Sequence, residues 1–232
     1  MMIKILPYLL LIFAIGVGVL LMTSFKAKTK NIILNTNNIA PKKSFYELEA
    51  ISIDGKKISF DQYKNKKILI VNVASKCGYT YQYEGLQKLQ DIYQDKVIVL
   101  GFPANDFFNQ EPGSVRDILE FCEGGYGVTF DMFEKVKVRG IDAHPLYKYL
   151  VAELLPVIRP RGFKSTLFQF FTHMYFWLKE HRFPHAGEVV WNFHKFVIGR
   201  NGQVVGHFSS DCDPFDPRLV ACIERELKEK TN

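Results

Sequence analysis

The four cysteines are the residues of this chain with the widest range of chemistry, and their spacing limits what they can do. Cys77, Cys122, Cys212 and Cys222 contain no C-x-x-C pair, so the spacing of zinc ligands and a dense disulfide framework are both absent. Cys77 follows the apolar run ILIVNVAS and precedes a helical pattern. That is the carboxyl end of a predicted strand, where sites gather in open parallel sheets, and a helix N-terminus there would favour the nucleophilic thiolate. From position alone, a buried structural cysteine explains Cys77 equally well.

The elements that must position Cys77 follow from the periodicity of the chain around it. Two alternating runs on either side of Asp54-Gly55 predict a hairpin. KKILIVNVAS and VIVLGFP are continuous apolar runs, each followed by a helical pattern, which predicts two parallel strands with a right-handed crossover. The segment VVWNFHKFVIGRNGQVVGHFS predicts an antiparallel hairpin turning at Asn201-Gly202, and PFDPRLVACIERELKEK predicts a final helix. The sequence thus predicts an α/β, thioredoxin-like sheet with an added N-terminal β-hairpin.

Several long motifs occur in one order along the chain: NVASKCGYT, GFPANDFFNQEPGS, GVTFDMFEKVKV, HPLYKYL and WNFHKFVIGRNGQVV. With them, residues from about 46 to the end resemble the glutathione peroxidases, and most closely the bacterial members in which cysteine replaces selenocysteine. The resemblance implies a catalytic tetrad of Cys77, Gln110, Trp191 and Asn192. The amides and the indole of the last three are neutral donors that can favour a thiolate and hold a peroxide with its departing oxyanion.

The resemblance further implies a thiol-dependent peroxidase active in oxidative stress. The Cys77 thiolate would attack hydrogen peroxide or an organic or lipid hydroperoxide, release water or an alcohol, and become a sulfenic acid. Glutathione or thioredoxin would then supply the electrons, with no bound cofactor, and neither a phosphate loop nor metal-ligand spacing is found in the sequence. Two alternatives belong to other classes: a redox relay or sensor that passes oxidation to a partner protein, and a non-catalytic thioredoxin-fold binding module.

Two departures from the family pattern bear on this mechanism. The family's F-P-C-N-Q-F reads FPANDF here, so Ala104 replaces a cysteine and Asp106 replaces a glutamine. If Asp106 pointed inward, its carboxylate would oppose the thiolate. His194 is tempting as a base, but we interpret it as a core or surface histidine, because the family chemistry does not require one.

The loss of a cysteine at Ala104 leaves Cys122 as the candidate resolving cysteine. It lies in EPGSVRDILEFCEG, a predicted helix with Ser114 and Asp117 in capping positions. A disulfide needs Cα atoms about 4.4–6.8 Å apart, so this helix would have to unwind, and the glycines that follow Cys122 would ease that step. A buried small hydrophobe explains Cys122 as well. We interpret Cys212 and Cys222 as structural.

The basic character of the chain is concentrated in two segments. Of a net charge of +6, most belongs to residues 1–30, which contain four lysines and no acid. Residues 5–25 are uncharged and approach the roughly 20 apolar residues that cross a bilayer. This pattern favours a membrane anchor over a cleaved signal or a buried helix, with residues 31–44 as a tether. An extracytoplasmic body is slightly favoured over a cytoplasmic one, and cleavage would make the protein secreted.

The second basic segment is an insert at residues 151–187 of the peroxidase-like domain, which we place at residues 45–232. Apolar residues recur there at helical spacing among lysines and arginines: Leu167, Phe170, Phe171, Met174 and Trp177–Leu178. Such a helix could lie on a membrane near peroxidised lipid. It could equally pack against the domain or against a second subunit in a homo-oligomer. The rest of the chain is close to neutral, so the charge pattern does not support a nucleic-acid partner.

Overall fold

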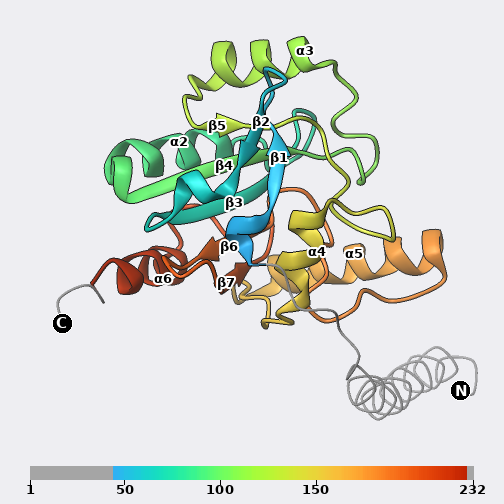
Figure 1. Cartoon of the computed structure of the whole chain (residues 1–232). Coiled ribbons are helices and arrows are strands. Elements are labelled where there is room, and N and C mark those ends of the chain that lie inside the picture. Colours follow the sequence, from blue (N-terminus) through green and yellow to red (C-terminus); the bar gives the residue numbers. More distant parts are fainter. Residues whose placement is uncertain (1–43, 229–232) are drawn as a thin grey trace, which may run out of the picture. The chain divides into compact units, whose positions relative to one another are not determined.

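The computed structural model describes residues 44–228 (Figure 1). These residues belong to one compact unit that spans Lys43–Asn232. The expected membrane segment at residues 5–25 and nearly all of the expected tether lie outside the described part of the chain. Within that part, no helix has both the length and the apolar character needed to cross a bilayer.

A five-stranded mixed sheet forms the centre of the described unit. In spatial order its strands are β5 (Asp131–Met132), β4 (Val97–Pro103), β3 (Lys67–Val73), β6 (Lys195–Ile198) and β7 (Val204–Phe208). β3 pairs parallel with β4, as the two apolar runs predict, and β4 pairs parallel with β5. β6 and β7 form the predicted antiparallel hairpin and join the sheet through β3. The thioredoxin-like prediction is therefore confirmed, although the two-residue strand β5 was not foreseen.

Helices cover both faces of this sheet. The helical elements are α2 (Gln82–Tyr93), α3 (Val115–Leu119), α4 (Pro145–Ala152), α5 (Phe163–Glu180), α6 (Pro217–Lys228), the π-helix η5 (Glu120–Gly124) and the 3-10 turns η2 (Phe45–Glu47), η3 (Phe60–Tyr63) and η4 (Gln94–Lys96). Every residue of β3 is buried, and successive side chains enter opposite layers of the core. Ile68 and Ile70 pack with α4, whereas Leu69 and Val71 pack with α2 and α6. This double coverage explains why β3 is a continuous apolar run.

The predicted N-terminal hairpin is present as β1 (Glu49–Ile51) and β2 (Lys57–Ser59). Gly55 has φ of +83° in the connecting turn, a backbone conformation that glycine adopts without strain. The hairpin is a separate two-stranded sheet, and with η2 and η3 it packs on the layer of the core that contains α4.

The helix that contains Cys122 changes its hydrogen-bonding pattern along its length. Ser114 and Asp117 form the predicted capping box at the start of α3. From Glu120 to Gly124 the helix is a π-helix, so the regular α ladder ends before it reaches Cys122. Short π segments often occur at functional sites.

The helix predicted in the insert is confirmed as α5, but its apolar stripe does not form part of the core. Leu167, Phe170, Phe171, Met174, Trp177 and Leu178 are exposed, between 38% and 62%. The residues of α5 that face the domain are instead Phe168, Thr172, Tyr175 and Phe176. Of the readings that the sequence left open, packing of this stripe against its own domain is therefore wrong.

Candidate active site

Cys77 lies in a turn at the carboxyl end of β3, five residues before the first residue of α2. The turn is held by Thr80, whose hydroxyl donates to the carbonyl of Ala74 at 2.9 Å and accepts the Cys77 N–H at 3.1 Å. The Tyr79 N–H donates to the Cys77 sulfur at 3.5 Å. The backbone donor beside the thiol thus belongs to a turn. The expected contact with a helix N-terminus is not made.

The structure brings the four residues of the predicted tetrad together. The Asn192 side-chain amide donates to Gln110 Oε1 at 2.9 Å. The side chains of Trp191 and Asn192 lie close enough to the Cys77 thiol for hydrogen bonding from each to lower its pKa. Cys77 is 8% exposed and Asn192 is fully buried. An indole and an amide therefore converge on one nearly enclosed sulfur, and the amide is itself bonded to Gln110.

Burial and hydrogen bonding act on the Cys77 thiol in opposite directions. Burial raises its pKa, because a low-dielectric surrounding disfavours the charged thiolate. The Tyr79 N–H, Trp191, Asn192 and the charge of Lys195 lower the pKa, but burial outweighs them in this state. The neutral donors lower the pKa of the thiol, which is the direction that the sequence predicted. Their effect only reduces the rise caused by burial, and the net pKa stays above the ordinary value.

An irregular backbone allows Trp191 and Asn192, which are adjacent, to reach the same sulfur. The regular strand β6 begins only at Lys195, and Phe193 has a left-handed φ of +64°. Asn72 on β3 holds this bend: its carbonyl accepts the Phe193 N–H at 2.6 Å and its amide donates to the Trp191 carbonyl at 3.0 Å. Sequence analysis missed Asn72, although a polar residue inside the apolar run ILIVNVAS was a usable signal.

Lys195 is the second supporting residue that sequence analysis missed. Its side chain is fully buried, and Nζ donates to the Phe193 carbonyl at 2.7 Å. Burial lowers its pKa to about 7, while charges of nearby acids such as Asp213 act against the shift. The available signal was a lysine in the middle of the apolar run WNFHKFVI.

A buried glutamate connects the Cys77 turn to the loop that contains Gln110. Glu111 is fully buried, and its two carboxylate oxygens accept the Ser75 N–H at 2.8 Å and the Ser75 hydroxyl at 2.7 Å. The Lys76 N–H donates to the Gln110 carbonyl at 2.9 Å. Burial raises the pKa of Glu111, and the bonds from Ser75 oppose that rise. These contacts fix the two loops relative to each other.

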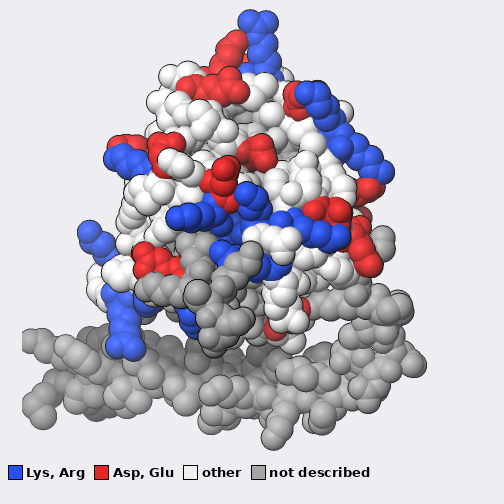
Figure 2. Space-filling model, turned by 60° about the vertical axis from the view of Figure 1, so that its left-hand side comes forward, with Lys and Arg blue, Asp and Glu red and all other residues white. Residues whose placement is uncertain are grey.

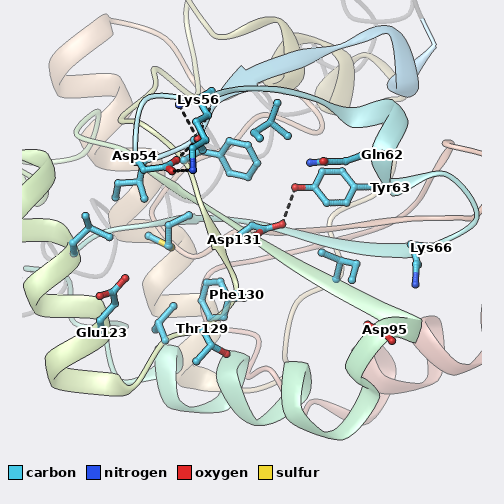
Figure 3. Close-up of a pocket in the computed structure, with 18 residues that line it drawn as sticks. Asp54, Lys56, Gln62, Tyr63, Lys66, Asp95, Glu123, Thr129, Phe130 and Asp131 are labelled. Carbon is cyan, nitrogen blue, oxygen red and sulfur yellow. Dashed lines mark hydrogen bonds and ion pairs between the residues drawn. The ribbon is translucent and has the colours of Figure 1, made fainter.

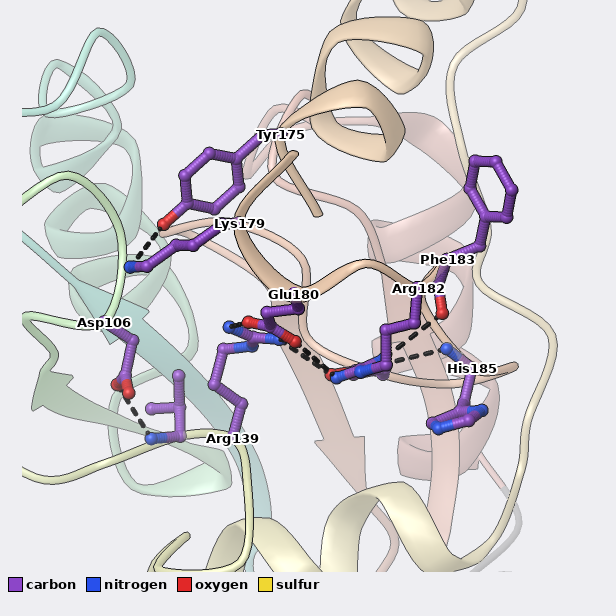
Figure 4. Close-up of polar contacts among 10 residues, drawn as sticks. Asp106, Arg139, Tyr175, Lys179, Glu180, Arg182, Phe183 and His185 are labelled. Carbon is purple, nitrogen blue, oxygen red and sulfur yellow. Dashed lines mark hydrogen bonds and ion pairs between the residues drawn. The ribbon is translucent and has the colours of Figure 1, made fainter. Parts of the chain in front are cut away.

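Asp106, one of the two departures from the family pattern, does not act on the thiol. Its carboxylate accepts the Val138 N–H at 3.0 Å (Figure 4). Burial raises the pKa of Asp106, and positive charges on Arg139, Lys137 and Lys179 lower it. The Asp106 carboxylate would disfavour the Cys77 thiolate only if it pointed inward. Its side chain is instead turned toward Val138. Ala104, the other departure, is buried in the core.

Cys122 is fully buried inside η5, and all four cysteines are free thiols. Burial raises its pKa to about 11, against a hydrogen bond with Tyr83 that lowers it. In this conformation Cys122 is therefore protonated and unreactive, and a resolving role would require η5 to open. That role stays a prediction.

The remaining candidates from the sequence lie in the core. Cys212 is fully buried and Cys222 is 8% exposed, as the structural interpretation requires. His194 is fully buried, with Nδ1 2.8 Å from Nε2 of His207. Burial and the neighbouring His207 hold the pKa of His194 well below its usual range. These contacts support its interpretation as a core histidine.

A separate hollow lies between the hairpin and β5 (Figure 3). Its volume is about 560 Å³, and Tyr63 at its wall donates to Asp131 at 2.8 Å. None of the tetrad residues lines it. The candidate site at the end of β3 is therefore separate from this hollow.

A thioredoxin-like sheet with a cysteine directly after β3, faced by an amide and an indole, defines a thiol oxidoreductase. Comparison with known proteins specifies the class. The glutathione peroxidase profile matches residues 45–151. A glutathione peroxidase of Lactococcus lactis is 39% identical over 187 residues, which covers 80% of this chain and 98% of that protein. The thioredoxin/glutathione peroxidase BtuE of Escherichia coli is 40% identical, with 75% and 92% covered.

Further relatives agree with this result. The glutathione peroxidase-like peroxiredoxin 2 of Saccharomyces cerevisiae is 42% identical over 172 residues, with 74% of this chain and 90% of that protein covered. Among solved structures, Trgpx in its apo form has a TM-score of 0.52 at 31% identity, covering 79% of this chain and 98% of its own. The chain belongs to the glutathione peroxidase family, and it is a peroxidase. Enzymes of this family take their electrons from glutathione or thioredoxin.

Proposed function

We propose that this protein reduces hydrogen peroxide and organic or lipid hydroperoxides at Cys77, in defence against oxidative stress. The observation that supports this most strongly is the position of the Asn192 amide, which joins Gln110 and the Cys77 thiol. In this proposal Cys77 is the nucleophile. Gln110, Trp191 and Asn192 bind and orient the peroxide.

The first half-reaction starts when Cys77 loses its proton. The thiolate attacks one peroxide oxygen, an S–O bond forms, and the O–O bond breaks. The departing oxygen leaves as an oxyanion that takes up the proton released by Cys77, giving water or an alcohol. Cys77 is left as a sulfenic acid, oxidised by two electrons. Hydrogen bonds from the Trp191 indole and the Asn192 amide stabilise the negative charge as it moves from sulfur to the departing oxygen.

The second half-reaction returns two electrons from thiols. In one route a glutathione thiol attacks the sulfenic acid sulfur, the S–O bond breaks, water leaves, and a second glutathione reduces the mixed disulfide. In the second route the Cys122 thiol attacks that sulfur, water leaves, and thioredoxin reduces the Cys77–Cys122 disulfide. The π-helical geometry at Cys122 supports the second route, because short π segments often occur at functional sites. The name thioredoxin/glutathione peroxidase given to the Escherichia coli relative is compatible with both.

Steady-state turnover tests this proposal directly. Purified protein should consume hydrogen peroxide or a lipid hydroperoxide over many cycles with thioredoxin or glutathione, and Cys77→Ser should abolish consumption. A single stoichiometric oxidation without turnover by either reductant would favour the redox relay instead. If the parent protein and Cys77→Ser bound a partner equally and neither consumed peroxide, a non-catalytic binding module would explain the protein better.

We further propose that the protein acts at a membrane, anchored by residues 5–25 with its body on the extracytoplasmic side. The outer face of α5, which we define as Leu167, Phe170, Phe171, Met174, Trp177 and Leu178, supports contact with lipid. These side chains are exposed on one helix, with the exposed cations Lys164 and Lys179 beside them. Aromatic and basic residues together suit an anionic bilayer surface. A second copy of the chain is the competing occupant.

Full-length protein in vesicles of phosphatidylcholine and phosphatidylglycerol tests the contact of α5. Phe171→Asp/Trp177→Asp should slow reduction of a phospholipid hydroperoxide in the vesicle while leaving reduction of hydrogen peroxide unchanged. Ile92→Asp/Ile141→Asp, at exposed apolar positions elsewhere, is the matched control and should behave like the parent. Equal rates in all three proteins would refute the lipid contact. If the parent is a dimer and Phe171→Asp/Trp177→Asp is a monomer, the outer face of α5 binds a second copy of the chain instead.

A further inference from the structure

The side of α5 opposite its outer face packs on Trp191 of the tetrad and on the loop before Gln110. Tyr175 lies 4.4 Å from the Phe108 ring between centroids and 6.0 Å, edge to face, from the Trp191 ring. Phe168 lies 6.1 Å from Trp191 and 5.3 Å from Tyr79, both edge to face. An insert that the peroxidase motifs do not include therefore supplies two aromatic walls around the indole that faces Cys77.

The loop that Tyr175 covers has an unusual backbone. Phe108 and Asn109 both have left-handed φ, +49° and +53°. Such a conformation is uncommon for an aromatic residue and persists only where its surroundings enforce it. The next residue is Gln110, whose side chain accepts the Asn192 amide. The Phe108 ring is 61% exposed and rests on Tyr175 and Trp191. Tyr175 is therefore one of the contacts that hold this turn, together with a hydrogen bond from the Asn105 amide to Asn109.

Ion pairs fix the end of α5 so that the Tyr175 ring is held firmly (Figure 4). Arg139 forms an ion pair with Glu180 and lies 4.1 Å above the Phe176 ring. Arg182 donates to Glu188 at 2.7 Å and 2.8 Å. The Lys179 ammonium donates to the Tyr175 hydroxyl at 2.8 Å. The ring is thus anchored on the helix side as well as stacked on the loop side.

We propose that Tyr175 is a positioning residue of the peroxidase site, holding Trp191 and the turn before Gln110 where the Cys77 chemistry requires them. This inference rests on the proposed function. The aromatic ring carries the effect, because the contacts with Phe108 and Trp191 are ring contacts, whereas the hydroxyl accepts a hydrogen bond from Lys179 on its own helix. Without the ring, the left-handed turn relaxes, Gln110 and Asn192 separate, and the indole loses its orientation toward the sulfur.

Two measurements on full-length protein test the role of Tyr175: the second-order rate of Cys77 oxidation by hydrogen peroxide at neutral pH, and the pH profile of Cys77 alkylation, read by mass spectrometry of its peptide. Tyr175→Ala should lower the rate about tenfold or more, as loss of a preorganised donor does, and should move the alkylation profile to higher pH. Tyr175→Phe keeps the ring and should restore both. Phe215→Ala, which removes an exposed ring outside α5, should match the parent.

A parent-like rate, within about twofold, and an unmoved alkylation profile in Tyr175→Ala would overturn the inference. If Tyr175→Ala does not fold, Tyr175→Leu retains apolar volume without the planar contacts and should show the same two effects. Failure of the proposed function is a distinct result: the parent itself would not be oxidised at Cys77. The alkylation profiles would still decide whether Tyr175 positions the donors.

Discussion

At the scale of single residues, two opposing effects act on the pKa of the enclosed Cys77 sulfur: burial and hydrogen-bond donors. Burial raises the pKa of Cys77, and contacts from Tyr79, Trp191 and Asn192 oppose it. Enclosure excludes water from the reacting sulfur and strengthens each remaining hydrogen bond. Burial therefore disfavours the thiolate. In the proposed reaction the thiolate forms within reach of the groups that would also bind peroxide.

Removing the indole donor should make Cys77 less acidic. In Trp191→Phe, burial is retained and one opposing hydrogen bond is lost, so the pKa of the thiol should rise further above its ordinary value. Because only the thiolate reacts, oxidation at neutral pH should slow and the rate should keep rising to a higher pH than in the parent. Stopped-flow oxidation across a pH series measures this shift. Trp177→Phe on the outer face of α5 serves as the control, and an unchanged profile in Trp191→Phe would contradict the assignment.

The sequence predicted the tetrad but not the residues that hold it. Motif matching identified Cys77 and Asn192 by residue type. The roles of Asn72 and Lys195 depend on the left-handed backbone of Phe193, and no local pattern of residue types reveals that conformation. The orientation of Asp106 was equally out of reach, since it is set by a backbone N–H that lies 32 positions further along the chain.

At the scale of elements, the two segments that depart from regular secondary structure or from the family motifs are η5 and α5. Periodicity predicted both helices and the capping of α3. It could not predict the π-helical turn at Cys122, and it left open whether the apolar stripe of α5 would contact a membrane, its own domain or a second subunit. Hydrophobic spacing reports which residues share a face. It does not report which face the domain covers.

Cys122 provides a test of the π-helical segment. Cys122→Ser should abolish thioredoxin-dependent cycling while leaving the first oxidation of Cys77 at the parent rate. The physical reason is that serine retains the size of the side chain but cannot form the disulfide. Peroxide consumption with thioredoxin, beside a single-turnover measurement, separates the two steps. Cys222→Ser is the control, and unimpaired cycling in Cys122→Ser would rule out a resolving role.

Acid should release the end of α5 before it unfolds the sheet. A hydrogen bond from Arg139 lowers the pKa of Glu180, and Arg182 keeps the pKa of Glu188 low despite its burial. Carboxylates with a depressed pKa stabilise the fold above the ordinary glutamate value of 4.5, and that contribution is lost as the pH falls through the lower folded value. Hydrogen exchange should show residues 163–183 losing protection at a higher pH than β3. Loss of both at one pH would contradict this.

At the scale of the whole molecule, the described unit mixes the two signs of charge. Figure 2 shows Lys and Arg interspersed with Asp and Glu over the face that it presents. The exposed apolar surface is, in contrast, concentrated: seven of the large exposed apolar side chains belong to α5, namely Phe163, Leu167, Phe170, Phe171, Met174, Trp177 and Leu178. The insert thus contributes an inner side that supports the tetrad and an outer face suited to lipid.

The fold and the family could be inferred from the sequence because long motifs and buried strands are determined locally. The arrangement of the insert could not, since it depends on contacts between α5, the loop before Gln110 and Trp191 that are distant in sequence. The same contacts suggest why a peroxidase would carry this insert. It places Trp191 of the tetrad against the inner side of the helix whose outer face we propose meets a membrane.

The most direct test of the account is mass spectrometry of the full-length protein after one equivalent of hydrogen peroxide, with a sulfenate-trapping reagent present. The account predicts that Cys77 is the residue oxidised, recovered as a trapped sulfenate or as a disulfide with Cys122, and that Cys77→Ser leaves the other three thiols unmodified. Recovery of Cys77 as a free thiol while the peroxide is consumed, or oxidation that persists in Cys77→Ser, would contradict it.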